Sequence, residues 1–342
     1  MYYGADNYTV VSGINKSACA YAKFADTQNV SGCGVLDIVT QIEIDSSQYM
    51  CTGIIEGYLT ATRINEALIN TRSYFSQDGI VPFPSKNLVN FFSEQQEWTA
   101  KQCQKPVGTF WLQACLIIAQ FNGLVRGVQT IFPDITSFDM MMLNSVGDLF
   151  QIMPAVDPAL RLPWSQLSRQ LFNAAARRSQ HCSGLIKVTD DFSDLMWSHS
   201  SWFTYGNMNR IYKHYSFGTK LSTPSRALSF SSYPGYLSSL DDFYIMDSGL
   251  AMIQTSNNVF NNTILEYIQP QSLLAWQRVR TAHAVASSGP EWYSNFKQFA
   301  SGTYANQYMI INTNLFTPLT PLPSNTLTVG CRRDAWNPLW LC

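Results

Sequence analysis

The fold is decided by the stretch Cys182-Ser-Gly-Leu-Ile-Lys-Val-Thr-Asp-Asp-Phe-Ser-Asp-Leu-Met-Trp-Ser-His199. Two short apolar runs, 184–188 and 195–197, flank a segment rich in aspartate and serine, which predicts a β-hairpin. The two antiparallel strands of such a hairpin would bring Cys182 and His199 near each other at their paired outer ends. A thiol and an imidazole brought together in this way can carry out acyl transfer.

The thiol of Cys182 needs a base, because the thiolate rather than the thiol is the nucleophile. One available base is the cysteine's own α-amine, whose ordinary pKa of about 8 suits proton transfer near neutrality. This amine exists only if the chain is cut between His181 and Cys182. The alternative from the residues alone is a cysteine that fills the core, with His199 as a hydrogen-bonded structural residue.

Apolar periodicity predicts strands and helices in the rest of the chain. Strand-like segments are 8–12, 18–24, 34–39, 244–254 and 308–312, and helix-like segments are 53–68, 88–103, 110–128, 263–280 and 294–300. This succession of helices and strands is typical of a layered α+β sandwich.

A series of motifs runs from residue 182 to about residue 316. The motifs are Cys182–Lys187, His199–Trp202, Arg210–Lys213, Phe230–Gly235, Asp241–Tyr244, Ser248–Leu250, Ser301–Tyr304 and Asn306-Gln307. In order and spacing they resemble the phospholipase B-like family. The resemblance implies an α+β fold of the N-terminal nucleophile hydrolase type, an αββα sandwich, in which a precursor cleaves itself to expose a catalytic cysteine.

The resemblance also implies roles for individual residues. Cys182 matches the nucleophile, and His199 matches a site histidine that would orient the freed amine or the substrate carbonyl. Ser256 matches a site threonine, of which it keeps the hydroxyl and loses the methyl group. Three further residues of the matched motifs would shape or polarise the pocket, namely Trp202, Asp242 and Asn306.

The same resemblance divides the chain into four parts. Residues 1–153 would form the first fragment, 154–181 a linker that covers the nucleophile until processing, and 182–329 the nucleophile-bearing fragment. Arg177-Arg178 offers an alternative cut site for a dibasic protease, or is simply a charged helix end. From Gly330 the match ends, so residues 330–342 form a divergent tail, and the C-terminal part that carries a site asparagine and a site arginine in relatives is expected to be missing.

Composition excludes several classes of function. Of the 342 residues, 46% are hydrophobic and 13% are charged, with a net charge of −1, which indicates a folded globular chain and gives no basis for binding nucleic acid. No zinc-type Cys/His spacing and no phosphate-binding glycine loop is present, so no metal or other cofactor is expected. The apolar run 110–125 is too short to span a membrane. The sequence does not indicate an oligomeric state.

Cysteines and sequons bear on the compartment. Cys103 and Cys115 flank a proline and a glycine and are predicted to form a disulfide that clips a loop between two helices. Glycosylation sequons begin at Asn7, Asn15, Asn29 and Asn261. The N-terminus lacks the features of a signal peptide, whereas the family resemblance implies a secreted or lysosomal protein.

Three functions follow as hypotheses. The first is a self-processing hydrolase that removes acyl groups from phospholipids or related esters and amides through Cys182. The second is an amidase acting on N-acyl or peptide substrates, because amidase chemistry is typical of the wider fold. The third is a noncatalytic glycoprotein or binding module that keeps the fold without turnover.

Overall fold

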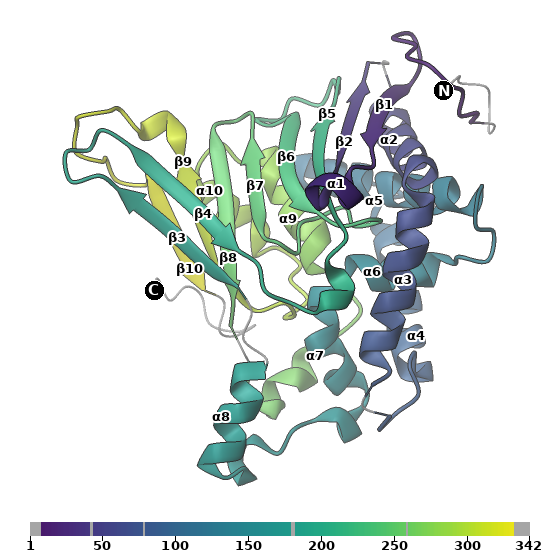
Figure 1. The fold of residues 1–342 in the computed structure, drawn as a ribbon, viewed down its shortest axis with the longest axis vertical. Coiled ribbons are helices and arrows are strands. Elements are labelled where there is room, and N and C mark those ends of the chain that lie inside the picture. Colours follow the sequence, from purple (N-terminus) through teal and green to yellow (C-terminus); the bar gives the residue numbers. More distant parts are fainter. Residues whose placement is uncertain (1–7, 42–43, 78, 179–181, 258, 332–342) are drawn as a thin grey trace.

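The computed structural model describes residues 8–41, 44–77, 79–178, 182–257 and 259–331 (Figure 1). Its strands are β1 (Ala20–Ala25), β2 (Cys33–Thr40), β3 (Ser183–Val188), β4 (Leu195–Ser200), β5 (Arg210–Ser216), β6 (Ala227–Ser232), β7 (Phe243–Met246), β8 (Leu250–Ser256), β9 (Asn306–Asn312) and β10 (Leu327–Cys331). Its α-helices are α1 (Gln28–Ser31), α2 (Asp45–Leu59), α3 (Ala61–Phe75), α4 (Lys86–Gln102), α5 (Gly108–Gln129), α6 (Ser137–Asn144), α7 (Val146–Val156), α8 (Arg169–Arg178), α9 (Ala275–Val285) and α10 (Gly289–Phe296).

The strands form one eight-stranded sheet, here called the main sheet, and a separate two-stranded hairpin. The main sheet has the order β1-β2-β5-β6-β7-β8-β9-β10, and all its neighbours are antiparallel except β2 and β5. The hairpin consists of β3 and β4. A mixture of helices with a mostly antiparallel sheet confirms the α+β class.

Two hydrophobic cores lie on opposite faces of the main sheet. The larger core joins one face to the helices, including α2, α5, α9 and α10 (Figure 1). The smaller core joins Leu195 of the hairpin to Ala251 and Ile311 of β8 and β9 on the other face. The described residues therefore stack as helices, main sheet and hairpin, and their second sheet has only two strands.

The hairpin explains a difference in burial along the main sheet. β8 is continuously buried from Leu250 to Gln254, because helices cover one face and the hairpin covers the other. β5 and β6 instead alternate between buried and partly exposed residues, because the hairpin does not reach them. This alternation is the ordinary pattern of a strand with one open face.

Helices α2 and α5 pack backbone against backbone through glycines. A Cβ atom at Gly53 would lie 1.9 Å from the Gln120 carbonyl oxygen, and one at Gly123 would lie 2.1 Å from the Met50 carbonyl oxygen. Among the described helices, α5 alone is long and apolar enough to cross a membrane by length and composition, and 56% of its most apolar window is buried inside the protein. Such burial is what a core helix shows, so α5 is weak evidence for a membrane span.

The expected strands 18–24, 34–39 and 308–312 and the helices 88–103 and 110–128 are present with small shifts of their ends. Two predicted elements are each split in two. The helix expected over 53–68 breaks at Thr60, whose hydroxyl donates to the Glu56 carbonyl, so α2 ends and α3 begins there. The strand expected over 244–254 is a hairpin of β7 and β8, because Gly249 adopts a φ of +80° in a turn.

Three other expectations were wrong. Residues 8–12 form only an isolated bridge rather than a strand. The helix expected over 263–280 is a short 3-10 segment followed by α9, because Pro270 cannot continue a helix. The last helix lies earlier than expected, at Gly289–Phe296, because the Ser288 side chain caps its first turn.

Two disulfides are present among the residues that the structure describes. Cys103–Cys115 joins the end of α4 to α5, as the sequence predicts. Cys19–Cys51, which the sequence analysis missed, ties the chain before β1 to α2. Among the described residues whose side chains are placed, Cys33 and Cys182 are free.

The sequons differ in their surroundings. Asn29 and Asn261 are exposed and Asn15 is half-buried, while Asn7 lies outside the described residues. The Asn261 side chain accepts hydrogen bonds from the backbone and hydroxyl of Thr263 in its own sequon. Glycosylation at these positions stays a prediction.

Candidate active site

The register of the hairpin positions Cys182 and His199. β3 and β4 pair with Ser183 opposite Ser200 and Gly184 opposite His199, so Cys182 lies directly before the first paired residue. A ligand atom of the Cys182 thiol, the His199 ring and the Asp242 carboxyl all lie within 4.8 Å of one another. We call these three residues the thiol cluster. His181, on the other side of the predicted cut, lies outside the described residues.

Asp242 enters the thiol cluster from the loop that precedes β7. Burial raises the pKa of its carboxyl well above the usual range, although hydrogen bonds from Tyr304 and Gln254 act in the opposite direction. The Tyr304 hydroxyl donates to Asp242 Oδ2 at 2.9 Å. Asp242 Oδ1 is buried and makes no well-formed hydrogen bond within the described part of the chain. Burial therefore favours the neutral form of this carboxyl, and Oδ1 is available to a further hydrogen-bond partner.

The thiol is not activated in the uncut chain. Burial, followed by the nearby Asp242 carboxyl, raises the pKa of Cys182 to about 11, although hydrogen bonds with the Trp202 backbone and the Ser201 hydroxyl oppose the rise. The Ser201 oxygen lies 4.0 Å from the sulfur. A thiol in these surroundings needs an added base or positive charge before it can attack.

His199 is a neutral imidazole with a defined tautomer. Burial lowers its pKa below the usual value. Nε2 lies 2.8 Å from the Gln254 carbonyl oxygen, and because a carbonyl only accepts, Nε2 must carry the proton. Nδ1 then holds the lone pair and is the nitrogen that can accept a proton or a hydrogen bond.

Three residues of this region have left-handed backbones. Cys182 has a φ of 72°, Asp242 a φ of 54° and Tyr304 a φ of 51°. Residues other than glycine seldom adopt this conformation, and such strain concentrates at functional sites. Three separate segments therefore bring strained residues to the same place.

Gln254 and Asn306 form the floor beside the thiol cluster. Both lie on the strand pair β8 and β9, where Ser256 is opposite Asn306. The Asn306 side-chain amide donates to Gln254 Oε1 at 2.8 Å, and Gln254 also accepts from His199 through its backbone. Asn306 Oδ1 is buried without a partner in the described residues.

Gln254 and Tyr304 were not predicted as site residues. Tyr304 ends the motif Ser301–Tyr304, and Gln254 ends the strand expected over 244–254. Gln254 lies two positions before Ser256 and therefore on the same face of the strand. The alternation of side chains between the two faces of a strand could therefore have identified Gln254 as a site residue. The position of Tyr304 depends on how the segment before β9 folds. No local sequence pattern predicts that fold.

The adjacent aspartates Asp241 and Asp242 behave in opposite ways. Burial opposes ionisation of Asp241, yet its ion pair with Arg210 and hydrogen bonds from Ser231 and Tyr233 hold the pKa of that carboxyl below its usual range. Arg210 Nε lies 2.8 Å from Asp241 Oδ2. Neighbouring acids with pKa values pushed apart are typical of sites that separate charged and proton-carrying roles.

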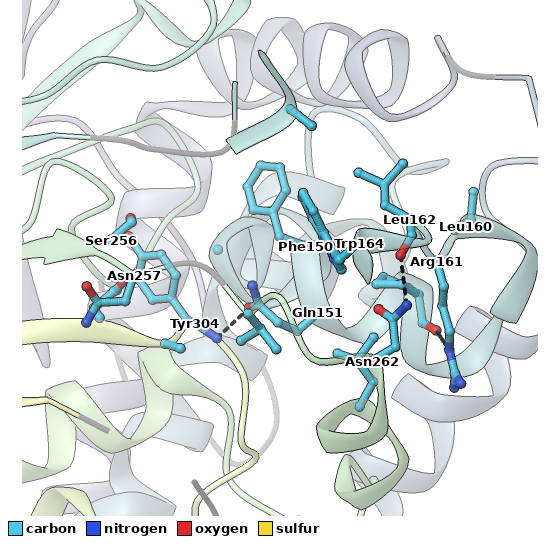
Figure 2. A pocket seen from close by; sticks show the side chains of 17 residues that line it. Phe150, Gln151, Leu160, Arg161, Leu162, Trp164, Ser256, Asn257, Asn262 and Tyr304 are labelled. Atoms are coloured by element: carbon cyan, nitrogen blue, oxygen red, sulfur yellow. Dashed lines mark hydrogen bonds between the residues drawn. The ribbon is translucent and has the colours of Figure 1, made fainter. Parts of the chain in front are cut away.

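The remaining predicted residues lie at the edge of the thiol cluster. Trp202 contributes its backbone near the sulfur, while its side chain is 51% exposed. Ser256 ends β8 and lines a cavity of about 200 Å³ together with Asn306 and Tyr304 (Figure 2). Figure 2 shows Ser256 and Tyr304 at one end of this cavity and Leu160 at the other.

Cys182, His199 and Asp242 also carry side chains of the types that bind metal ions. Thiolate, imidazole and carboxylate are the ligands that zinc takes in proteins, and this is the one such group found within the described residues. Among the described residues, no cationic side chain contacts the two acids and the imidazole of this cluster. Either a metal ion or an ammonium group would supply the missing positive charge.

The comparisons agree on one family. The Phospholipase B family model matches residues 20–330. Rat phospholipase B-like 1 is 38% identical over 89% of this chain and 56% of its own length, and phospholipase-B 81 of the snake Drysdalia coronoides is 38% identical over 94% and 60%. Phospholipase B-like protein D of Dictyostelium discoideum is 33% identical over 95% and 58%. The chain thus spans less than two thirds of the length of these relatives, and the extent of the family match shows that it belongs to the phospholipase B family.

Proposed function

We propose that the chain is a self-processing lipid hydrolase whose nucleophile is Cys182. In the first step the sulfur attacks the carbonyl carbon of residue 181, the C–N bond to Cys182 breaks, and the Cys182 nitrogen takes up the proton that leaves the thiol. Water then hydrolyses the thioester, which releases a carboxylate on residue 181 and restores the thiol. The product carries a free α-amine on Cys182.

The observation that carries this proposal is the thiol cluster, in which the sulfur, an imidazole nitrogen and a carboxyl oxygen lie within 4.8 Å of one another. Before the cut, His199 Nδ1 is the nearby group that can accept the thiol proton. After the cut, the new α-amine adds a base of ordinary pKa about 8 on the nucleophile itself. As an ammonium group it would also favour ionisation of Asp242, because an opposite charge stabilises a carboxylate.

The proposed substrate is an acyl ester or amide of a lipid, as the names of the relatives suggest. The Cys182 sulfur would attack the acyl carbonyl, the leaving alcohol or amine would take the proton from the α-ammonium, and water would hydrolyse the acyl thioester. The Trp202 backbone N–H, which lies near the sulfur, is the proposed donor to the oxyanion. Whether ester or amide is preferred follows from comparing matched acyl esters and acyl amides as substrates.

Intact-mass analysis tests the self-processing step. The wild-type chain should yield a fragment that begins at Cys182, and Cys182→Ala should stay whole. Cys33→Ala is the matched control, because Cys33 is also free and partly buried, and it should be cut normally. Cleavage of the Cys182→Ala chain before residue 182 would overturn the proposal.

A bound cation is the second candidate, because the thiol cluster has the donor set of a zinc site. The two candidates differ in what supplies positive charge. Cut protein stripped with EDTA and checked by metal analysis should hydrolyse an acyl ester at the rate of the untreated protein if the α-amine supplies it. Loss of hydrolysis that added zinc restores would favour the metal site instead.

A noncatalytic binding module is the third candidate, because the buried thiol is unreactive in the uncut chain. Mass analysis after exposure to a lipid ester decides between the two. A hydrolase gives a transient acyl adduct on the fragment that begins at Cys182, whereas a binding module gives none.

We also propose a secreted or lysosomal location. The two disulfides support it, because such bonds persist in oxidising compartments. The exposed sequons at Asn29 and Asn261 are open to a glycosyltransferase. A mass decrease on treatment with an N-glycosidase should occur for protein made in the secretory pathway, and Asn261→Gln should remove one step of that decrease.

A further inference from the structure

We propose that the end of α4, the start of α5 and the segment after α10 together form a surface that docks onto an anionic lipid surface. Exposed apolar side chains would enter the boundary between lipid headgroups and acyl chains, and lysines beside them would contact lipid phosphates. This docking surface consists of two tryptophans, two other apolar residues and two lysines, namely Trp98, Trp111, Val107, Phe299, Lys105 and Lys297. The inference goes beyond the proposed hydrolysis, because it names a partner for the folded chain and does not require Cys182 to react.

The apolar part of the docking surface is an aromatic cluster that the fold covers only in part. The Phe299 ring centroid lies 4.9 Å from that of Trp111 and 6.2 Å from that of Trp98, and the two tryptophan rings lie 5.6 Å apart. Trp111 is buried, whereas Phe299 is 44% exposed. Val107, directly before α5 and one helical turn from Trp111, is 81% exposed. Two segments far apart in the sequence therefore bring exposed apolar side chains near Trp111, unlike the single exposed residues of an ordinary surface.

The backbone holds these side chains in place without a ligand. The disulfide Cys103–Cys115 closes the loop that carries Val107. Phe299 has a left-handed backbone with a φ of 51°, and its carbonyl oxygen accepts a hydrogen bond from the Leu273 N–H at 2.7 Å. Bulky residues seldom adopt this conformation, and such strain concentrates at functional positions. A pre-formed surface loses little conformational freedom on binding.

The charge of the docking surface favours an anionic partner. Each exposed apolar residue follows a lysine by two positions, in Lys105-Pro-Val and in Lys297-Gln-Phe. Both lysines are exposed, and neither forms an ion pair within the part of the chain that the structure describes. The acid next to Trp98 in the sequence, Glu97, already pairs with Lys101 at 2.7 Å. Positive charge therefore remains uncompensated beside the apolar side chains.

A lipid surface fits this combination better than a protein partner does. Protein interfaces are depleted in lysine, whereas tryptophan and lysine together are typical of segments at a membrane boundary. There the aromatic rings lie at the level of the headgroups, and the lysines reach the phosphates. The segment that carries Phe299 continues to Tyr304, which donates to Asp242 of the thiol cluster. A docked lipid surface would thus contact a segment that also supports the candidate active site.

Flotation with lipid vesicles tests the docking surface without turnover. The Cys182→Ala chain should bind vesicles of phosphatidylcholine mixed with phosphatidylserine at least tenfold more tightly than vesicles of phosphatidylcholine alone. Each lysine near an anionic membrane is expected to strengthen binding about fivefold. The difference between the two kinds of vesicle should shrink as salt is added, because salt screens exposed charges.

The apolar contribution is tested by two single variants. Val107→Ser and Phe299→Ser should each weaken binding to the mixed vesicles about tenfold, because each removes an apolar group that would leave water on docking. Val30→Ser is the matched control, because Val30 is 90% exposed on α1 and is not part of the docking surface. It should bind as the parent chain does. Melting temperatures establish that each variant is folded.

The charge contribution is tested by a double variant. Lys105→Glu with Lys297→Glu should remove the preference for phosphatidylserine. Lys16→Glu with Lys23→Glu changes the net charge equally at two exposed lysines outside the docking surface, and it should keep the preference.

Three outcomes decide the inference. Vesicle binding that both folded apolar variants leave unchanged would overturn it. A parent chain that binds neither kind of vesicle but elutes as a dimer, and becomes a monomer with Val107→Ser, would also overturn it, because the surface would then be a protein interface. Vesicle binding that the apolar and lysine variants weaken would uphold it even if Cys182 proves uncut and inactive, which separates it from the proposed hydrolysis.

Discussion

Two buried polar groups of this protein have opposite characters. Lys213 of β5 and Glu56 of α2 are fully buried, with 2.7 Å between Nζ and Oε1, and Tyr215 donates to the second Glu56 oxygen. The thiol cluster of Cys182, His199 and Asp242 is also largely buried, but no side chain of opposite charge contacts it within the described residues. Both groups are thus buried, but only in the first is each charge neutralised by an opposite charge.

The difference shows how burial can serve structure or chemistry. Burial lowers the pKa of Lys213, but Glu56 opposes the shift, so the pair fixes a helix to the sheet. In the thiol cluster burial raises the pKa of both acids and leaves Asp242 Oδ1 without a partner. A buried pair whose charges cancel contributes to the stability of the fold. A buried group without a counter-charge is instead stabilised when an opposite charge is added, here the proposed α-ammonium.

The largest effect is expected from Asp242→Asn. Turnover of an acyl substrate by the cut protein should fall by about 100- to 10,000-fold, because the group that meets the new amine is lost. The melting temperature should not fall, because the replaced carboxyl has no ion pair among the described residues. Timed mass spectrometry and thermal melts measure the two quantities.

Asp241→Asn is the control for that variant. Asp241 pairs with Arg210, so its replacement leaves a half-buried guanidinium without its partner and should lower the melting temperature. If Asp241→Asn and Asp242→Asn lowered the melting temperature equally, the inference that only Asp241 stabilises the fold through an ion pair would be wrong.

Lys213→Met should destabilise the fold by about 3–5 kcal/mol, because it leaves Glu56 buried without a counter-charge. Urea unfolding measures the change. The double variant Lys213→Met with Glu56→Leu should recover part of the loss, because it removes both charges. A single variant within about 1 kcal/mol of wild type would mean that the buried pair is not the anchor we infer.

Asp148 provides an intermediate case, a buried carboxyl with hydrogen bonds but no ion pair. Burial raises its pKa from 3.8 to about 6, although Thr303, Arg278 and the Ala275 backbone oppose the rise. The folded state therefore binds this proton more tightly than the unfolded state. The stabilisation is complete below about pH 4 and is lost as the pH rises to about 6, a change of about 3 kcal/mol.

Asp148→Asn keeps the oxygen acceptor and removes the titration. The difference in unfolding free energy between wild type and variant, measured from pH 4 to pH 7, should shift by that amount, with wild type losing stability as the pH rises. A difference that is flat across this range would contradict the raised pKa.

The smallest effect is expected from Trp202→Ala. Its half-exposed side chain stands away from the core, and its backbone makes the contact near the sulfur. Self-cleavage should change by about twofold or less, since the backbone N–H remains. A large loss would show that the indole itself shapes the thiol cluster.

Local patterns in the sequence predict part of this structure. The β3–β4 hairpin is confirmed, because two apolar runs and an aspartate-rich turn specify it within eighteen residues of sequence. The register of that hairpin then brings Cys182 and His199 together. The disulfide Cys103–Cys115 is predictable for the same reason, since its partners are 12 residues apart.

Contacts between distant segments explain what the sequence left undetermined. Tyr304 reaches Asp242 across 62 residues, and Glu56 reaches Lys213 across 157. Neither contact has a local signature. The disulfide Cys19–Cys51 was missed because its partners lie in a strand region and a helix that meet only after the sheet forms. Ser256 was predicted as a catalytic residue, and the structure places it on the wall of the cavity.

The parallel pair β2 and β5 has a consequence for a cut chain. The two strands come from opposite sides of the His181–Cys182 bond, yet they are matched from Cys33 with Arg210 to Val39 with Ser216. After a cut at this bond, the hydrogen bonds between β2 and β5 would still hold the two fragments together. The processed protein would show two bands on a denaturing gel and elute as one particle on a sizing column, and its halves would part only when the sheet itself melts.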